Sequence, residues 1–175
     1  MRSTYSVFDT HDVYDACRAG GRPSVDASTR SIEYETMLLG RHRALTTPRL
    51  RDDGDRLERS AYILLSRLEL AGPMSIGQLS DAFRLDPSTL NRQTSAMVRA
   101  GLVERIPDPE GGIARKFRVT AEGEHRLRME REQNVRSLEK VLAGWPEDDV
   151  AAFAAYLRRF NGDIERLEGR PWPRP

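Results

Sequence analysis

The sequence predicts a mainly α-helical protein with a small β-wing, in which a winged helix-turn-helix is flanked by helices on both sides. Three observations carry this prediction. Residues 75–83 read as a short helix, followed by a turn and a second helix that starts at Asp86-Pro87. Two β-like runs then border a glycine-rich loop. Long helical patterns precede and follow this module, which commonly places one helix in the major groove of DNA.

The N-terminal part divides into an arm and a helix. Residues 1–28 carry few large apolar side chains, so we expect an arm that is either disordered or docked on another part. Residues 31–45 follow a helical pattern in which Ile32, Leu38 and Leu45 recur at helical intervals. Pro48 and the acidic segment after it end this pattern.

Residues 57–71 form the clearest amphipathic pattern in the chain. Their apolar residues fall on one continuous helical face: Leu57, Ala61, Leu64, Leu65, Leu68 and Ala71. Gly72 and Pro73 end the pattern. We interpret this segment as a core helix without a chemical role.

The next two helices carry strong local start signals. Ser75 and Gln78 have the spacing of a capping box. Asp86 is a good N-cap, and Pro87 falls at the first helical position, where its missing N–H is not needed. The second helix is predicted to reach Ala100. Its inward residues are Leu90, Thr94, Met97 and Val98.

Residues 102–106 and 116–119 alternate like two paired strands, and residues 107–114 connect them with Gly111 and Gly112 at the tip. Thr120 then caps a helix that runs to about residue 143, where Gly144 stops it.

The last helix begins near Pro146, and its apolar residues follow a strict a/d spacing: Val150, Phe153, Leu157, Phe160, Ile164 and Leu167. Such a narrow seam packs on another helix. The partner is either the preceding helix, through residues such as Leu138 and Val141, or a second copy of the chain. Residues 169–175 form a Pro-rich tail.

Composition narrows the classes of function. The net charge is only +1, but residues 84–118 hold seven basic and four acidic residues, whereas residues 145–168 hold three basic and six acidic. A basic centre suits a protein that presents one face to a polyanion. No apolar run is long enough for a membrane span, and no secretory signal is visible. The single cysteine, Cys17, fits a reducing cytoplasm.

The sequence offers no sign of an enzyme, a metal site or a cofactor. It lacks a nucleophile elbow, and Gly111-Gly112 lacks the lysine and the following helix of a phosphate-binding loop. The three histidines are scattered, and no cluster has metal-ligand spacing.

The outward face of the second helix has the side chains that DNA recognition requires, since Arg reads guanine, Asn and Gln read adenine, and hydroxyls hold phosphates. The wing adds bases that suit the minor groove. The predicted double-stranded DNA contacts are Ser75, Ser88, Thr89, Asn91, Arg92, Gln93, Ser95, Arg99, Arg115, Lys116 and Arg118.

The segment LDPSTLNRQTSAMVRAGLVERIPDPEGG, with RKFRVTAEG after it, resembles the multiple-antibiotic-resistance regulator (MarR) family of bacterial transcription factors. The resemblance covers about residues 32–167, and its specific motifs lie between Leu85 and Gly123. It implies a winged-helix homodimer in which the first and last helices join the protomers and each protomer reads half of a pseudo-palindrome. It also implies DNA contacts from Ser88, Thr89 and the residues after them, with Arg105 supporting the wing.

The resemblance implies a division into a DNA-binding domain at residues 57–120 and a helical dimerisation region at residues 29–56 and 121–168. This chain departs from the family pattern at the wing. Many members have an Asp-x-Arg pair there, and this chain has Gly111-Gly112-Ile113. The minor-groove role then falls to Arg115.

Family members often bind small aromatic ligands, and His42 is the candidate for lining such a site. We therefore expect a repressor relieved by a small-molecule inducer. Two alternatives stay open: a redox-sensing regulator that uses Cys17, and a winged-helix protein-interaction module without sequence-specific DNA readout.

Overall fold

The computed structural model describes residues 25–41 and 57–174, which belong to two units divided after Ala44. The described part of the first unit is one helix, α2 (Val25–Arg41). It begins six residues before the predicted start, inside the segment predicted to be an arm. Arg30 pairs with Asp26 at 2.8 Å one turn earlier. Ion pairs between residues four apart stabilise a helix even where it has no apolar face. The apolar spacing alone therefore did not predict the part of α2 before residue 31.

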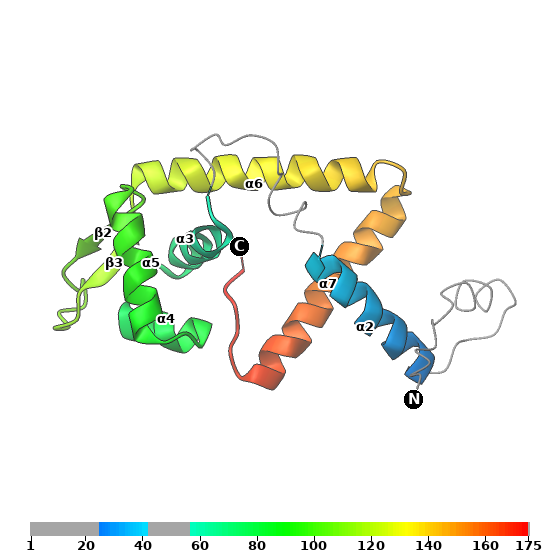
Figure 1. Cartoon of the computed structure of the whole chain (residues 1–175), viewed down its shortest axis with the longest axis horizontal. Helices are drawn as coiled ribbons and strands as arrows, with labels where there is room; N and C mark the ends of the chain where they lie inside the picture. The colour runs from blue at the N-terminus through cyan, green and yellow to red at the C-terminus, as the bar shows by residue number, and fades with distance from the viewer. Residues whose placement is uncertain (1–24, 42–56, 175) are drawn as a thin grey trace, which may run out of the picture. The chain divides into compact units, whose positions relative to one another are not determined.

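The elements of the second unit follow the predicted order (Figure 1). They are α3 (Arg59–Ala71), β1 (Met74–Ser75), α4 (Ile76–Phe83), α5 (Pro87–Arg99), β2 (Val103–Ile106), β3 (Lys116–Val119), α6 (Ala121–Leu142) and α7 (Glu147–Glu168). The mainly helical fold with a small β-wing is confirmed. The sequence analysis missed β1, because two residues are too few to show strand alternation.

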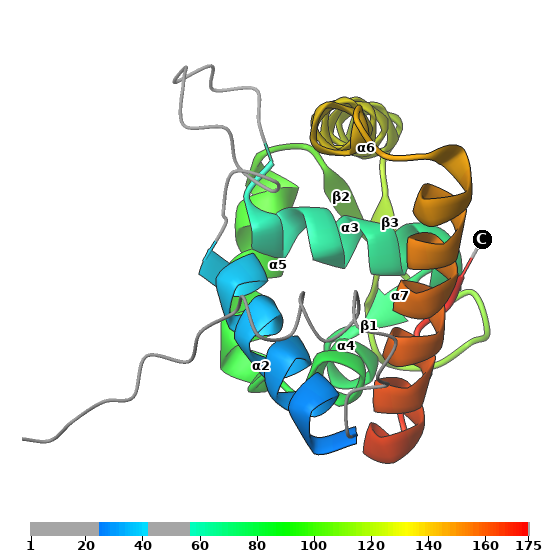
Figure 2. The ribbon, with the colours of Figure 1, turned by 90° about the vertical axis from the view of Figure 1, so that its right-hand side faces the viewer.

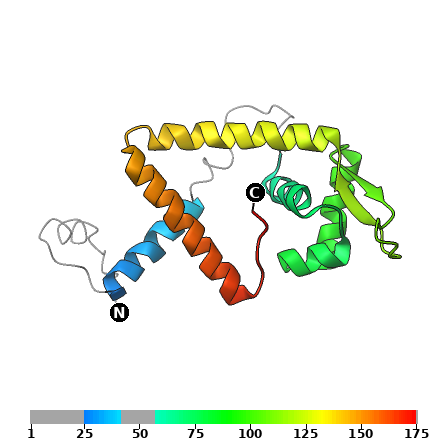
Figure 3. The ribbon, with the colours of Figure 1, turned by 180° about the vertical axis from the view of Figure 1, so that it is seen from behind.

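The three strands form an antiparallel sheet in the order β1-β3-β2. In the hairpin, Val103 lies opposite Val119 and Ile106 lies opposite Lys116. On the other edge of β3, Met74 pairs with Phe117. The loop between β2 and β3 is the wing, and it projects beyond α4 and α5 (Figure 3).

One apolar cluster unites the helices and the sheet of this unit. Its members include Leu64, Leu65 and Leu68 of α3, Leu79 of α4, Leu90 and Met97 of α5, Val103, Phe117 and Leu127. Each fully buried leucine contributes about 2 kcal/mol of transfer free energy. α3 packs directly under α6, as Figure 2 shows in a view that looks nearly along the α6 axis. The predicted core face of α3 is confirmed at Leu64, Leu65 and Leu68, whereas Ala71 at the end of the helix is exposed.

The junction between the wing and α6 depends on Thr120 and Gly123. The Thr120 hydroxyl donates to the Gly101 carbonyl oxygen at 2.6 Å and accepts from the Gly123 amide at 3.0 Å. A Cβ atom on Gly123 would overlap the carbonyl oxygen of Leu102. The first turn of α6 therefore lies against Leu102, the residue before β2, at a distance that only glycine allows.

α7 has no buried residue within the part of the chain that the structure describes. The rings of Phe153 and Phe160 are 42% and 46% exposed, and Leu167 is 87% exposed. Leu138 and Val141 of α6 are exposed as well, so these two side chains do not cover the seam. None of the described helices is long and apolar enough to cross a membrane.

The chain after α7 is not helical, as predicted, but it is docked. Gly169 ends α7 with a φ of 68°. The segment then runs back toward α3, drawn in red in Figure 1. The indole ring of Trp172 meets the ring of Phe83 edge to face, with centroids 5.5 Å apart, and the Arg67 guanidinium lies over it.

Candidate DNA-binding interface

The helix-turn-helix is held by hydrogen bonds that its own sequence supplies. The Ser75 hydroxyl accepts from the Gln78 amide at 3.2 Å, and the Ser75 amide donates to Gln78 Oε1 at 2.8 Å, which confirms the capping box. In the turn, Arg84 adopts a left-handed conformation with φ of 52°. The Ser80 hydroxyl donates to the Leu85 carbonyl oxygen at 2.7 Å and closes this turn.

Asp86 caps α5, as predicted. Its carboxylate accepts from the Ser88 amide at 2.7 Å. The hydrogen bonds from the Ser88 side chain and backbone lower the pKa of the Asp86 carboxyl. Pro87 occupies the start of the helix. The N-terminal turn of α5 therefore has a fixed direction before it meets any partner.

α5 separates cleanly into an inner and an outer face. Leu90, Thr94 and Met97 are buried, and the Thr94 hydroxyl donates to the Leu90 carbonyl oxygen at 2.8 Å. The predicted contact residues are on other positions. Ser88, Asn91, Arg92 and Arg99 are exposed, whereas Thr89, Gln93 and Ser95 are partly buried. Among the described residues, no ion pair or hydrogen bond holds the Arg92 guanidinium.

The wing is organised around the carboxylate of Asp108. Lys116 Nζ lies 2.8 Å from Asp108 Oδ1, and the Glu110 amide donates to the same oxygen at 3.0 Å. The Gly112 amide also donates to this carboxylate, and a Cβ atom on Gly112 would overlap it. The hydrogen bond from Lys116 is the largest of the causes that lower the pKa of Asp108.

Lys116 takes part in a second ion pair, with Glu110 at 3.2 Å. Its side chain is only 8% exposed. The hydrogen bond to Asp108 raises the pKa of Lys116 above its ordinary value. The ammonium group thus joins both acids of the wing loop and stays charged.

The sequence model of the MarR family matches residues 57–111. YxaD of Bacillus subtilis (strain 168), an uncharacterized HTH-type transcriptional regulator, is 33% identical over 130 residues, which cover 74% of this chain and 90% of YxaD. The chain belongs to the MarR family. It is therefore a DNA-binding transcription regulator of the winged-helix type.

Solved structures agree on the fold. RV1404 from Mycobacterium tuberculosis superposes with a TM-score of 0.64 at 19% identity, covering 88% of this chain and 100% of RV1404. The PcaV transcriptional regulator from Streptomyces coelicolor, solved in complex with its natural ligand, gives 0.58 at 24% identity, with 82% and 100% covered. At these identities the likeness shows the shared fold alone.

One of the predicted DNA contacts of this MarR-family regulator lies inside the wing. The side chain of Lys116 is only 8% exposed, and its ammonium group pairs with Asp108 and Glu110. A DNA contact from Lys116 would have to replace these two ion pairs, and it stays a prediction. Alternation along β3 does not show which basic residue the acidic loop holds.

The other two wing bases differ from each other. Arg118 is 55% exposed and makes two hydrogen bonds to Glu104 Oε1, at 2.7 and 3.0 Å, across the β2–β3 pair. Arg115 is exposed, and no ion pair holds it within the described part of the chain. The Arg105 guanidinium lies over the Phe117 ring at 5.3 Å. Arg115 is therefore the base that the wing leaves available.

Sequence reasoning did not single out two notable wing residues. The Asp108 carboxylate joins Lys116 to the backbone of the wing loop. Ile113 is fully exposed near the glycine tip, two residues from Arg115. Its position between Gly112 and Ala114 was the available signal, because apolar wing residues can contact the minor groove.

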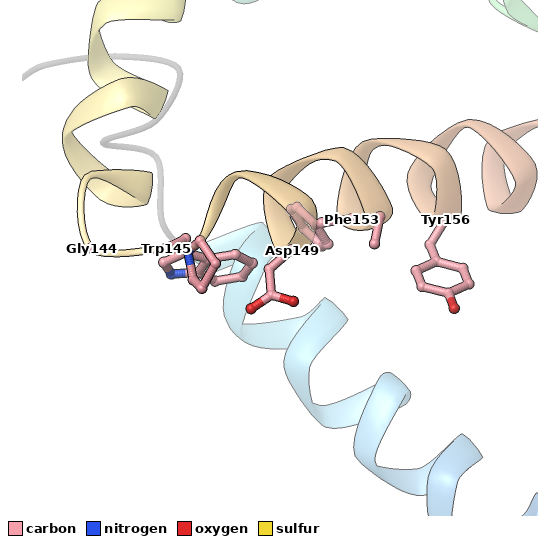
Figure 4. A pocket seen from close by; sticks show the side chains of 7 residues that line it. Gly144, Trp145, Asp149, Phe153 and Tyr156 are labelled. Carbon is pink, nitrogen blue, oxygen red and sulfur yellow. The ribbon is translucent and has the colours of Figure 1, made fainter.

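The exposed side of α7 includes a hollow of about 420 Å³ near its start (Figure 4). Trp145, Phe153 and Tyr156 line it, together with Gly144, Pro146, Asp149 and Ala152. The rings of Trp145 and Phe153 lie 5.6 Å apart. All three aromatic side chains are at least 42% exposed, so the hollow belongs to an open apolar surface.

The predicted ligand and redox residues are not placed. His42 and Cys17 lie outside the described residues. Within residues 25–41 and 57–174, no group of three His, Cys, Asp or Glu residues could hold a metal ion.

Proposed function

We propose that this MarR-family regulator binds a pseudo-palindromic operator as a homodimer, with α5 in the major groove and the wing at the adjacent minor groove. The observation that carries the proposal is the outer face of α5. Asn91 and Arg92 are exposed close to the capped N-terminus, with no partner holding Arg92 among the described residues. Asn and Arg are the side chains that read adenine and guanine edges.

Arg92→Ala tests this arrangement. A bidentate contact to a base discriminates by about 1–3 kcal/mol, so we expect the variant to bind the operator about 5- to 150-fold more weakly. The measurement is fluorescence anisotropy with operator DNA selected from the upstream region of the gene and with random DNA. Arg136→Ala, which removes an exposed arginine of α6, is the matched control and keeps full affinity. Equal binding by wild type and Arg92→Ala would show that α5 does not read DNA.

Salt dependence separates specific recognition from weak association. Each neutralised phosphate releases counterions, so the operator affinity falls steeply as salt rises. The hydroxyl and arginine side chains predicted to hold phosphates are Ser75, Ser88, Thr89, Ser95, Arg99 and Arg118. The logarithm of the affinity falls linearly with the logarithm of the salt concentration. Removing one phosphate contact lowers the magnitude of this slope by about one, whereas removing a base contact leaves it nearly unchanged.

The exposed seam of α7 supports the dimer. Val150, Phe153, Leu157, Phe160, Ile164 and Leu167 lie on one face, and none of them is buried. An apolar stripe of this length needs a partner helix. Leu157→Asp is therefore expected to yield monomers in sedimentation velocity. Ala155→Asp, on the opposite face of the helix, leaves the dimer intact. A dimeric Leu157→Asp protein would place the interface elsewhere.

We also propose that a small aromatic ligand relieves repression. The support is the ligand complex of PcaV, a protein that shares this fold. The test titrates aromatic carboxylates and phenols against the protein–operator complex, and release of DNA is the expected result. The redox alternative predicts instead that peroxide releases DNA from wild type and not from Cys17→Ser.

A second candidate function is a protein-interaction module without DNA readout. Its support is Gly111-Gly112-Ile113, which lacks the charged pair common in the wing of the family. The Arg92→Ala measurement decides between the two functions, because a module of this kind binds operator and random DNA alike and loses nothing with Arg92.

A further inference from the structure

The residues after α7 form a strap that returns to the DNA-binding domain. Gly169 ends the helix, and the Arg170 amide donates to the Glu165 carbonyl oxygen at 2.9 Å. Pro171 and Pro173 then restrict the backbone, because proline fixes its own φ and disfavours a helical conformation in the residue before it. The strap leaves α7 in a narrow range of directions.

The side chain of Glu165 holds the strap at the α7 end. Its carboxylate accepts from the Trp172 amide at 3.1 Å and from both Nη atoms of Arg174, at 2.6 and 2.8 Å. Arg174 also donates to the Trp172 carbonyl oxygen at 3.1 Å. The ion pair with Arg174 is the main cause of the lowered pKa of Glu165. Both backbone groups of Trp172 are thus bonded.

The side chain of Trp172 reaches the other end of the strap. Its indole ring meets Phe83 edge to face, at 5.5 Å and 74°, a favourable geometry for two aromatic rings. On another side the Arg67 guanidinium lies 5.0 Å from the ring centroid and donates to the Pro171 carbonyl oxygen at 3.4 Å. Trp172 is therefore half-buried, in contact with Arg67 of α3 and Phe83 of α4, and tied to α7.

Phe83 is the last residue of α4 and stands next to the turn of the helix-turn-helix. Arg84, in the left-handed conformation, follows it, and Asp86 caps α5 two residues later. Contacts therefore run from Glu165 through Trp172 and Phe83 to the turn that aims α5.

We propose that Trp172 is a positioning residue for operator recognition: the strap holds the turn before α5 at a set position relative to α7 and so limits the half-site spacing that the dimer accepts. This inference rests on the proposed dimeric DNA-binding function. Half-sites lie on one face of DNA when their centres are about one helical turn apart, so a shift between α7 and α5 changes the spacing that fits.

The test uses Trp172→Ala in the full chain with a panel of operators whose half-sites are moved apart or together by one or two base pairs. Loss of one aromatic pair corresponds to about a two- to tenfold change. We expect the variant to lose about that much affinity at the optimal spacing and less or none at the others, so that its spacing preference flattens. Trp172→Phe keeps a ring against Phe83 and largely retains the preference.

Arg170→Ala is the matched control, because its side chain takes no part in these contacts, and it keeps the wild-type spacing profile. A uniform loss at every spacing, or an unchanged profile, would overturn the proposal. If Trp172→Ala fails to fold, Arg174→Ala serves instead, because it removes the pair with Glu165 and leaves the ring in place. It too should flatten the profile.

Hydrogen exchange gives a readout that does not need DNA. The amides of Arg84, Leu85, Asp86 and Ser88 should exchange faster in Trp172→Ala than in wild type, and unchanged exchange there would refute the strap contact. Wild-type protein that binds operator and random DNA equally would instead refute the proposed function, whatever the exchange rates show.

Discussion

We predict that alanine at position 123 destabilises the protein, although alanine normally stabilises a helix when it replaces glycine. Replacing glycine by alanine inside a helix typically stabilises by about 1 kcal/mol. At Gly123 a Cβ atom would overlap the Leu102 carbonyl oxygen and crowd Val119. Because the Leu102 carbonyl oxygen also accepts from the Thr120 amide at 3.1 Å, it cannot turn aside without losing that hydrogen bond, and overpacking of this kind costs about 1–3 kcal/mol. We therefore expect Gly123→Ala to destabilise the protein by about 1–2 kcal/mol net.

The matched control is the same substitution in another helix. A Cβ atom on Gly162 of α7 would meet nothing within 4 Å, so Gly162→Ala should stabilise by about 0.5–1 kcal/mol. Urea denaturation followed by circular dichroism measures both variants, with the midpoint compared at constant slope. A Gly123→Ala protein as stable as wild type, or more stable, would show that α6 can move away from β2 and would refute the reasoning.

Three further predictions concern the wing and the cap of α6. Lys116→Met removes the cation between the wing acids, so the amides of Asp108 and of residues 110–115 should exchange faster while the global unfolding midpoint changes little. The pKa of Asp108 is lowered, so its contribution to wing order is present above the ordinary aspartate pKa of about 3.9 and is lost as the pH falls through the lowered value. NMR of the wing amides between neutral and strongly acid pH measures this, and early loss near neutral pH would contradict it. Thr120→Ala removes the cap and the hydrogen bond to Gly101, at a cost of about 1–2 kcal/mol in denaturation, and Thr120→Ser should restore most of it.

The sequence predicted the helices of the second unit because their ends are set by near neighbours. Ser75 meets Gln78 three residues later, Asp86 meets Ser88, and Thr120 meets Gly123. The buried face of α3 follows equally from apolar spacing. The outward position of Asn91 and Arg92 follows from the period of α5. Each of these features depends on residues within one or two turns of each other.

Other features depend on which distant segments meet. The wing lysine was predicted to face DNA, yet the loop acids bury it. The strand β1 forms only because β3 offers it a free edge. Pairing of this kind depends on backbone hydrogen bonds across many residues, and no local pattern reports it.

The amino-acid order alone determined most helix boundaries of the second unit, the buried face of α3 and the outward face of α5, since short-range capping and hydrophobic periodicity act within each segment. Tertiary structure decided that Lys116 pairs with Asp108 and Glu110. It also decided how closely α6 approaches Leu102 at Gly123, and where the ring of Trp172 docks. These outcomes depend on contacts between segments far apart in the chain, and such contacts exist only once the core has brought the segments together.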